Sequence, residues 1–106
     1  MTIDEPRPGV SGPLPVLAPH GDFDQDTLPP LEVRIREAAD AHGGLILDAS
    51  RITFGDSTFL RLLLTIHQEA ELRIAAPSPA ITRLIRLIGA DQVLHIHPTV
   101  EDAQTT

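Results

Sequence analysis

Residues 45–64 limit the fold of this chain more than any other stretch. The stretch opens with Leu45-Ile46-Leu47, an apolar run without alternation, which predicts a strand covered on both faces. A short polar connection leads to Asp56, and from there apolar residues, mostly leucine, recur at helical spacing as far as Ala70. The stretch therefore predicts a buried strand, a turn and a helix over 56–70, with Ser57 and Thr58 in the first turn of that helix.

The rest of the chain continues this alternation of strands and helices. The further predicted elements are an edge strand over 14–19 that prolines interrupt, a polar turn over 21–24, a helix capped by Asp26 or Thr27 that ends at 42, a strand over 72–76, a helix over 79–88 that Ser78 caps, and a strand over 93–97. Crossover connections between such strands are right-handed in nearly all proteins. The pattern predicts an α/β fold, a small mixed sheet with helices packed mainly on one side.

Chain length leaves room for one domain. Residues 1–13 are rich in proline, glycine and acids, and they predict a flexible N-terminal tail. The single domain is expected over 14–103, with a polar tail that starts at Glu101 and leaves 104–106 outside the domain.

The charge balance excludes several classes of function. A formal net charge of −7 repels nucleic-acid phosphates, so we expect no nucleic-acid partner. Every basic residue other than histidine is arginine, so no lysine can serve a phosphate-binding loop or a Schiff base. Without cysteine there is no disulfide or thiol nucleophile. No apolar run is long enough to span a bilayer and no signal peptide is visible, which predicts a cytoplasmic protein without membrane insertion.

A serine hydrolase is one interpretation of Gly55-Asp56-Ser57, which resembles the Gly-Asp-Ser opening of the SGNH (GDSL) esterases. A nucleophilic serine needs an oriented base and oxyanion donors. That family takes a donor from asparagine, which this chain lacks, and Asp91 and His95 are spaced by four rather than three. The tripeptide alone is a weak indication of catalysis.

A metal site and a phosphoacceptor aspartate are two further interpretations of the sequence. His95 and His97 share one face of a strand, but no third ligand stands at a recognisable spacing, so we expect polar surface residues and no metal site. Asp48 at a strand end, with Asp22 and Asp24 nearby, suggests a phosphoacceptor aspartate of the receiver type. That chemistry also needs a lysine, which is missing.

Asp56-Ser57-Thr58 allows two explanations. Aspartate and serine are favoured at helix N-termini for structural reasons alone. Alternatively, Ser57 is a phosphoacceptor.

The wider pattern resembles the STAS domains of the anti-sigma factor antagonists (anti-anti-sigma factors). Their signature is a strand, an Asp-x-Ser segment, and Asp-Ser-Ser/Thr-Gly-Leu at the start of a helix. Here the matching residues are Asp48-Ala49-Ser50 and Asp56-Ser57-Thr58-Phe59-Leu60, with Gly21-Asp22-Phe23-Asp24, Pro79-Ala80-Ile81-Thr82-Arg83-Leu84-Ile85 and Gly89-Ala90 outside them. The resemblance covers about residues 14–103.

This resemblance implies a protein–protein switch without a cofactor or catalysis of its own. Ser57 corresponds to the phosphorylated serine of the family, Thr58 to its hydroxyl neighbour, and Asp24 and Asp56 to acids beside the phosphosite. The implied partners are an anti-sigma factor that is a serine kinase of the histidine-kinase-like ATPase fold, and a serine phosphatase. The alternative within the family is a STAS subunit of a lipid-transport ABC complex, which docks on its ATPase without phosphorylation.

Phe59 departs from the family pattern, which has glycine at this position. A glycine lets a partner's backbone approach the helix. Phe59 either fills that gap or offers an exposed aromatic anchor to a partner. The apolar face of the helix is wider than one stripe, with Phe59 and Leu62 outside it, as expected of an interaction surface beside a phosphosite; a fully buried helix is the alternative. The predicted partner-binding residues are Asp24, Asp56, Ser57, Thr58, Phe59, Leu60 and Leu62.

Overall fold

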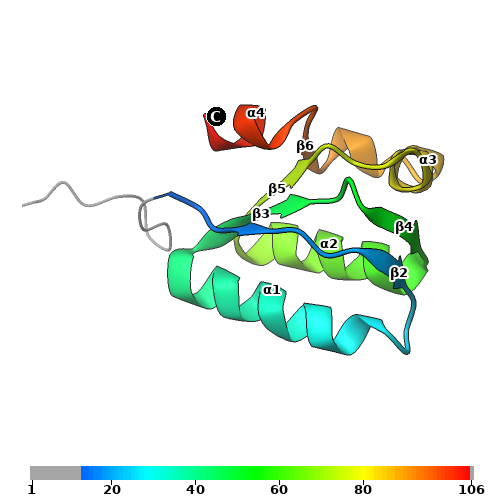
Figure 1. Cartoon of the computed structure of the whole chain (residues 1–106), viewed down its shortest axis with the longest axis horizontal. Coiled ribbons are helices and arrows are strands. Elements are labelled where there is room, and N and C mark those ends of the chain that lie inside the picture. The colour runs from blue at the N-terminus through cyan, green and yellow to red at the C-terminus, as the bar shows by residue number, and fades with distance from the viewer. Residues whose placement is uncertain (1–12, 106) are drawn as a thin grey trace, which may run out of the picture.

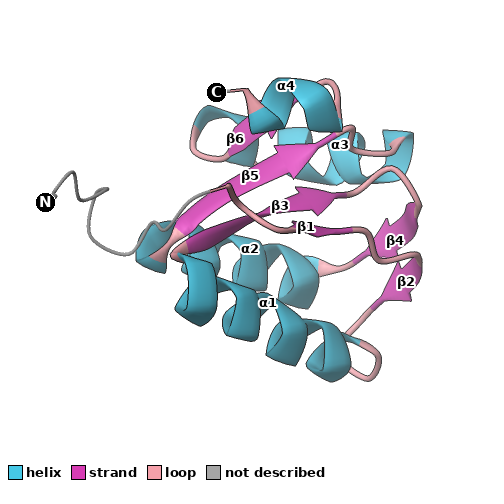
Figure 2. Ribbon diagram, turned by 60° about the vertical axis from the view of Figure 1, so that its left-hand side comes forward, coloured by secondary structure: helices cyan, strands magenta, loops and turns pink. Residues whose placement is uncertain are grey.

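Strands and helices alternate along the chain in the computed structural model, which describes residues 13–105 (Figures 1 and 2). All but the last residue of the predicted N-terminal tail lies outside these described residues. The elements are β1 (Val16–Leu17), β2 (Gly21–Phe23), α1 (Leu28–His42), β3 (Gly44–Asp48), β4 (Ile52–Gly55), α2 (Ser57–Glu69), β5 (Glu71–Ala75), α3 (Pro79–Leu87), the 3-10 helix η1 (Ala90–Gln92), β6 (His95–His97) and α4 (Val100–Gln104).

Four strands form the main sheet in the order β1-β3-β5-β6, and β2 and β4 form a separate pair. Every pairing among the described strands is parallel. The α/β class is therefore confirmed, but the sheet is parallel rather than mixed. Each strand of the main sheet is reached by a crossover through a helix, and this arrangement is what parallel pairing requires.

Strand β3 is covered on both faces, as its unbroken apolar run predicts. Leu45 and Leu47 are in the main core together with residues of α1, α2 and α3. Ile46, on the opposite face because side chains alternate along a strand, packs with Ala75 and Ala103. Among the described helices, α1, α2 and α3 thus contribute to the core on one face of the sheet, and the short helix α4 packs on the other.

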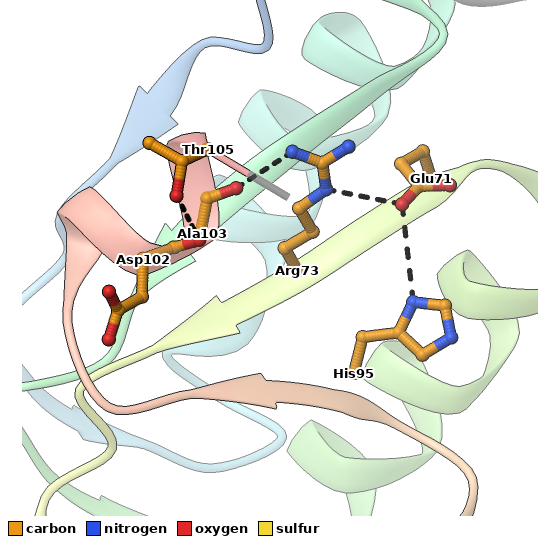
Figure 3. Close-up of polar contacts among 6 residues, drawn as sticks. All are labelled: Glu71, Arg73, His95, Asp102, Ala103 and Thr105. Atoms are coloured by element: carbon orange, nitrogen blue, oxygen red, sulfur yellow. Dashed lines mark hydrogen bonds and ion pairs between the residues drawn. The ribbon is translucent and has the colours of Figure 1, made fainter.

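The prediction of a polar tail from Glu101 onward is wrong, because these residues form α4. Its first turn is capped by Thr99, whose Oγ1 accepts a hydrogen bond from the backbone N–H of Asp102, and Ala103 is fully buried. From β5, Arg73 Nη1 donates a hydrogen bond of 2.7 Å to the carbonyl oxygen of Ala103, and Arg73 Nε bonds to Glu71 (Figure 3). The domain therefore extends beyond residue 103 into this helix.

The pairing of β2 with β4 was not anticipated from the sequence. The predicted turn over 21–24 contains β2, and the predicted polar connection after residue 51 contains β4. In Figure 1 the two strands lie side by side at the end of the molecule where α1 and α2 begin. This pair therefore links the starts of two helices that are far apart in sequence.

None of the helices within residues 13–105 is both long and apolar enough to cross a membrane.

Candidate functional site

Ser57 is the first residue of α2, and its side chain is exposed. Leu63 and Ile66 of the same helix are buried in the main core, which fixes α2 against the sheet. Within residues 13–105, the Ser57 hydroxyl makes no hydrogen bond. The hydroxyl that the family resemblance implies to be the phosphoacceptor is therefore exposed, on a helix that packs against the sheet.

Asp56 is the N-cap of α2. Its Oδ1 accepts hydrogen bonds from the backbone N–H groups of Thr58 at 3.0 Å and Phe59 at 3.1 Å. These are two of the donors that the first turn of a helix leaves without an intrahelical partner. The structural explanation for Asp56 is thus correct, and the same bonds fix the carboxylate beside Ser57.

The short β2–β4 ladder brings Asp24 to this end of α2. Phe23 and Gly55 are paired in the ladder, so the residues that follow them, Asp24 and Asp56, leave adjacent strands at the same level. Adjacent strands are about 4.8 Å apart. The N–H of Asp56 also donates to the carbonyl oxygen of Phe23 at 3.3 Å. The structure thus places Asp24 at the end of the ladder from which α2 starts, as the family resemblance implies.

The Asp24 carboxylate is held within its own loop. Its Oδ1 accepts hydrogen bonds from the backbone N–H groups of Asp26 and Thr27 and from the hydroxyl of Thr27. These bonds, with those from Thr27 as the main cause, lower the pKa of Asp24 below its ordinary value of 3.8. Asp24 therefore contributes a fixed negative charge in the loop that follows β2.

Phe59 is fully buried, so the prediction that it offers an exposed aromatic anchor is wrong. Its ring stacks on Phe23, with the ring centroids 6.1 Å apart and the planes at 22°. Gly55 leaves the space for it, because a Cβ atom there would lie 2.6 Å from Cδ2 of Phe59. Phe59 instead fills the space at the base of α2, which was the other explanation for this residue.

The predicted contact roles of Leu60 and Leu62 are also wrong for the described structure. Their exposed fractions are 2% and 6%, and both are in the main core. Residues of α1 and α3 share that core, so it accommodates an apolar face wider than one stripe. The wide face of α2 is therefore a consequence of packing and is not an interaction surface.

Phe54 is the exposed aromatic residue that sequence reasoning did not assign to the site. Half of its surface is accessible, at 50%, although it lies in the β4 strand. It is three residues before Ser57, so the Cα atoms of the two residues are at most about 10 Å apart. No sequence signal pointed to it, because Ile52-Thr53-Phe54 alternates apolar and polar residues and so predicts that Phe54 shares the buried face of Ile52. In the structure the strand register shifts at this point, and both Thr53 and Phe54 are exposed.

The other candidate residues, Asp48 and the two histidines of β6, make local contacts of their own. Asp48 accepts a hydrogen bond from the N–H of Ser50, a local turn. His95 Nδ1 lies 4.0 Å from Glu71, and the His95 ring contacts the edge of His67 (Figure 3 shows the first contact). His97 is in the adjacent part of β6 and is partly buried. A search of residues 13–105 finds no cluster of three or more metal-ligating side chains.

Taken together, the fold and the site define a small parallel α/β domain that presents a serine at a helix N-terminus, next to the capping carboxylate of Asp56 and at the end of the ladder where Asp24 follows β2. The chain belongs to the STAS domain family: a family model described as "Mlab, STAS domain" matches residues 11–96.

Two solved structures are similar to the chain over most of its length. One is the crystal structure of an anti-sigma factor antagonist from Mycobacterium paratuberculosis, with 33% sequence identity and a TM-score of 0.76, covering 95% of this chain and 87% of that one. The other is the anti-sigma factor antagonist SpoIIAA in its unphosphorylated form, with 21% identity and a TM-score of 0.68, covering 83% of this chain and 82% of that one. The second likeness concerns the fold alone.

Proposed function

We propose that this protein is an anti-sigma factor antagonist, a protein–protein switch controlled by phosphorylation of Ser57. The observation that carries the proposal is the exposed Ser57 hydroxyl at the start of α2, next to the capping carboxylate of Asp56. The similarity to the mycobacterial antagonist supports the same class.

In the free protein, a phosphate on Ser57 changes little. It adds a charge of about −1.5 to −2. The helix dipole favours that charge by about 0.3–2 kcal/mol. The gain is small here because Asp56 already accepts the hydrogen bonds of the Thr58 and Phe59 N–H groups. We therefore expect the fold of the phosphorylated protein to be unchanged.

In a complex that buries this surface, the same phosphate becomes costly. An unpaired charge in a dry interface costs about 2–5 kcal/mol. Phosphorylation should therefore weaken binding by about 30-fold to a few thousandfold, since 1.4 kcal/mol is tenfold. The unphosphorylated protein binds the anti-sigma factor, and the phosphorylated protein is released.

The contact surface that we propose contains the polar residues of the earlier prediction together with Phe54. Asp24, Asp56, Ser57 and Thr58 remain, while the buried Phe59, Leu60 and Leu62 are left out. The kinase is the anti-sigma factor itself, a serine kinase of the histidine-kinase-like ATPase fold, and a serine phosphatase restores the free hydroxyl. The protein needs no cofactor for this role, since ATP is bound by the kinase.

The direct test is to incubate the protein with its anti-sigma factor and ATP, and to map the modified residue by mass spectrometry. We expect about one phosphate per chain, on Ser57. Thr58→Ala is the matched control, because it removes the neighbouring hydroxyl and should still be phosphorylated. A phosphate on Thr58, or on no residue of this turn, would contradict the proposal.

A second candidate is the STAS subunit of a lipid-transport ABC complex. It is favoured by the capping of α2 by Asp56, because the helix start is already stabilised and can dock on an ATPase without a phosphate. In that case Ser57 is not modified and the partner does not use it as a substrate. The third candidate, a serine hydrolase, requires Ser57-dependent turnover of a simple ester such as p-nitrophenyl acetate.

A further inference from the structure

The outer face of α3 carries a shallow groove that the proposed function does not use. It has a volume of about 570 Å³, and its lining residues are Pro77, Pro79, Thr82, Arg83, Arg86 and Leu87. Leu87 is 76% exposed, a large apolar surface for a residue that contacts little of the core. The groove therefore combines apolar walls with two cationic side chains.

The groove lies off the face of α3 that packs on β4, the strand that leads to Ser57. Ile81 points to β4, because its Cδ1 would lie 3.2 Å from a Cβ atom at Gly55. Successive residues of a helix are rotated by about 100°, so the groove residues of α3 are each at least about 100° around the helix from Ile81. A partner in this groove would therefore not cover Ser57.

Arg83 and Arg86 are available for a ligand. Both are exposed, and within residues 13–105 neither guanidinium is within ion-pair distance of an acid. By contrast, Arg36 and Arg73 are both paired with glutamates. A smaller hollow of about 220 Å³ continues from Arg86 toward β6, where Asp91 is the single acid in either lining. The groove is thus a local cationic surface on a chain with a net charge of −7.

We propose that this groove binds an acidic amphipathic helix of a protein partner. Arg83 and Arg86 are three residues apart on α3, which places their Cβ atoms about 5–6 Å apart. Carboxylates three or four residues apart on a facing helix have the same spacing. Leu87 and the two prolines then contact the apolar side chains of that helix, in the way that helices dock in grooves. Binding here is independent of the phosphorylation state of Ser57.

The test uses a synthetic helical peptide of about 15 residues, long enough to form a helix, with glutamate and leucine on one face. It is titrated into the isotope-labelled full-length protein, and backbone NMR shifts are followed. We expect shifts that centre on Thr82, Arg83, Arg86 and Leu87, while those of Ser57 stay unchanged. The same peptide with glutamine in place of glutamate should bind at least about fivefold more weakly, because the charge attraction is lost.

Matched variants distinguish binding in the groove from nonspecific attraction to exposed arginines elsewhere on the protein. Arg83→Glu should weaken binding at least about fivefold. Arg34→Glu reverses an exposed arginine on α1 that pairs with no acid among residues 13–105, and it should leave binding unchanged. Leu87→Ala should weaken binding several-fold, whereas Val33→Ala, which alters an exposed valine of α1, should not.

The proposal is overturned if the peptide does not bind, if its shifts centre on Ser57, or if Arg34→Glu reduces affinity as much as Arg83→Glu. Tighter binding of a single-stranded RNA of the same length to this face, at physiological salt, would also overturn it, because the groove would then be a nucleic-acid site.

Discussion

A Cβ atom on Gly55 would lie only 2.6 Å from Cδ2 of Phe59. The phenylalanine ring thus occupies the volume that a side chain at position 55 would fill, and it stacks on Phe23 beneath the start of α2. STAS domains of the antagonist family have glycine at the position of Phe59, so this chain has a large side chain there and none at position 55. The two positions are therefore coupled by packing.

This coupling predicts a non-additive double mutant. Phe59→Ala should lower the free energy of unfolding by about 3–5 kcal/mol, because it leaves a cavity. Gly55→Ala alone should cost about 1–3 kcal/mol through overpacking. Gly55→Ala in the Phe59→Ala background should cost far less, with a coupling energy of about 1 kcal/mol or more. Urea unfolding of the four proteins measures this, and additive costs would show that the two side chains do not compete for space.

The Asp24 carboxylate predicts a specific response to acid. Its pKa in the folded protein is below the ordinary value of 3.8, mainly because of the hydrogen bonds from Thr27. A lowered folded pKa contributes stability above the unfolded value, and this contribution is lost as the pH falls through the folded pKa. Asp24→Asn should therefore be less stable than the wild type near neutral pH, and the difference should shrink below pH 3.8. Chemical denaturation across this range measures the difference.

Thr27→Val serves as the control for this effect. It keeps the backbone N–H that bonds to Asp24 but removes the hydroxyl. NMR titration of the Asp24 carboxyl group should then give a pKa closer to the ordinary value. An Asp24 pKa that does not rise in this variant would contradict the assigned cause.

The hydrogen bonds of Arg73 predict that this side chain stabilises the packing of α4 on the sheet. Its side chain is 11% exposed and bonds to the carbonyl oxygen of Ala103 and to Glu71 (Figure 3). Arg73→Met should cost about 1.5–3 kcal/mol, the range for hydrogen bonds with a charged partner, and should speed amide hydrogen exchange in α4. Arg36→Met is the control, since that side chain is 43% exposed and its ion pairs should contribute less than about 1 kcal/mol. Equal losses in both variants would argue against a special role for Arg73.

The backbone conformation of Ala76 predicts that a glycine at this position would stabilise the folded protein. It has a φ of +50°, a left-handed conformation that costs an L-residue more than it costs glycine. Ala76→Gly should therefore raise the free energy of unfolding by about 0.5–1 kcal/mol. Ala75→Gly, one residue earlier and fully buried in β5, should lower it by a similar amount. Thermal unfolding of both variants measures these changes in stability, and destabilisation by Ala76→Gly would contradict the prediction.

The start of α2 was predictable because its signals are local. Asp56 is a favoured N-cap residue, and the leucines that follow have helical spacing, so the position of Ser57 followed from neighbours in sequence. The burial of Phe59 was not predictable in this way. It depends on Phe23, which reaches α2 only through the pairing of two strands of three and four residues.

Helix α4 escaped prediction for a similar reason. Glu101 and Asp102 in its first turn give it the composition of a solvated tail. A single buried side chain, Ala103, and a hydrogen bond from Arg73 in β5 hold it on the sheet. Such distant partners are not visible in a local pattern, which is why this helix was not predicted.

The central claim is that a charge at Ser57 controls binding without changing the fold. Isothermal titration calorimetry of the anti-sigma factor with the unmodified protein and with protein carrying phosphoserine at Ser57 tests it most directly. The account predicts an affinity lower by about 30-fold to a few thousandfold for the phosphorylated protein. Protein with phosphoserine at the exposed Ser50 should bind as the unmodified protein does. Equal affinities of the unmodified and Ser57-phosphorylated proteins would contradict the account.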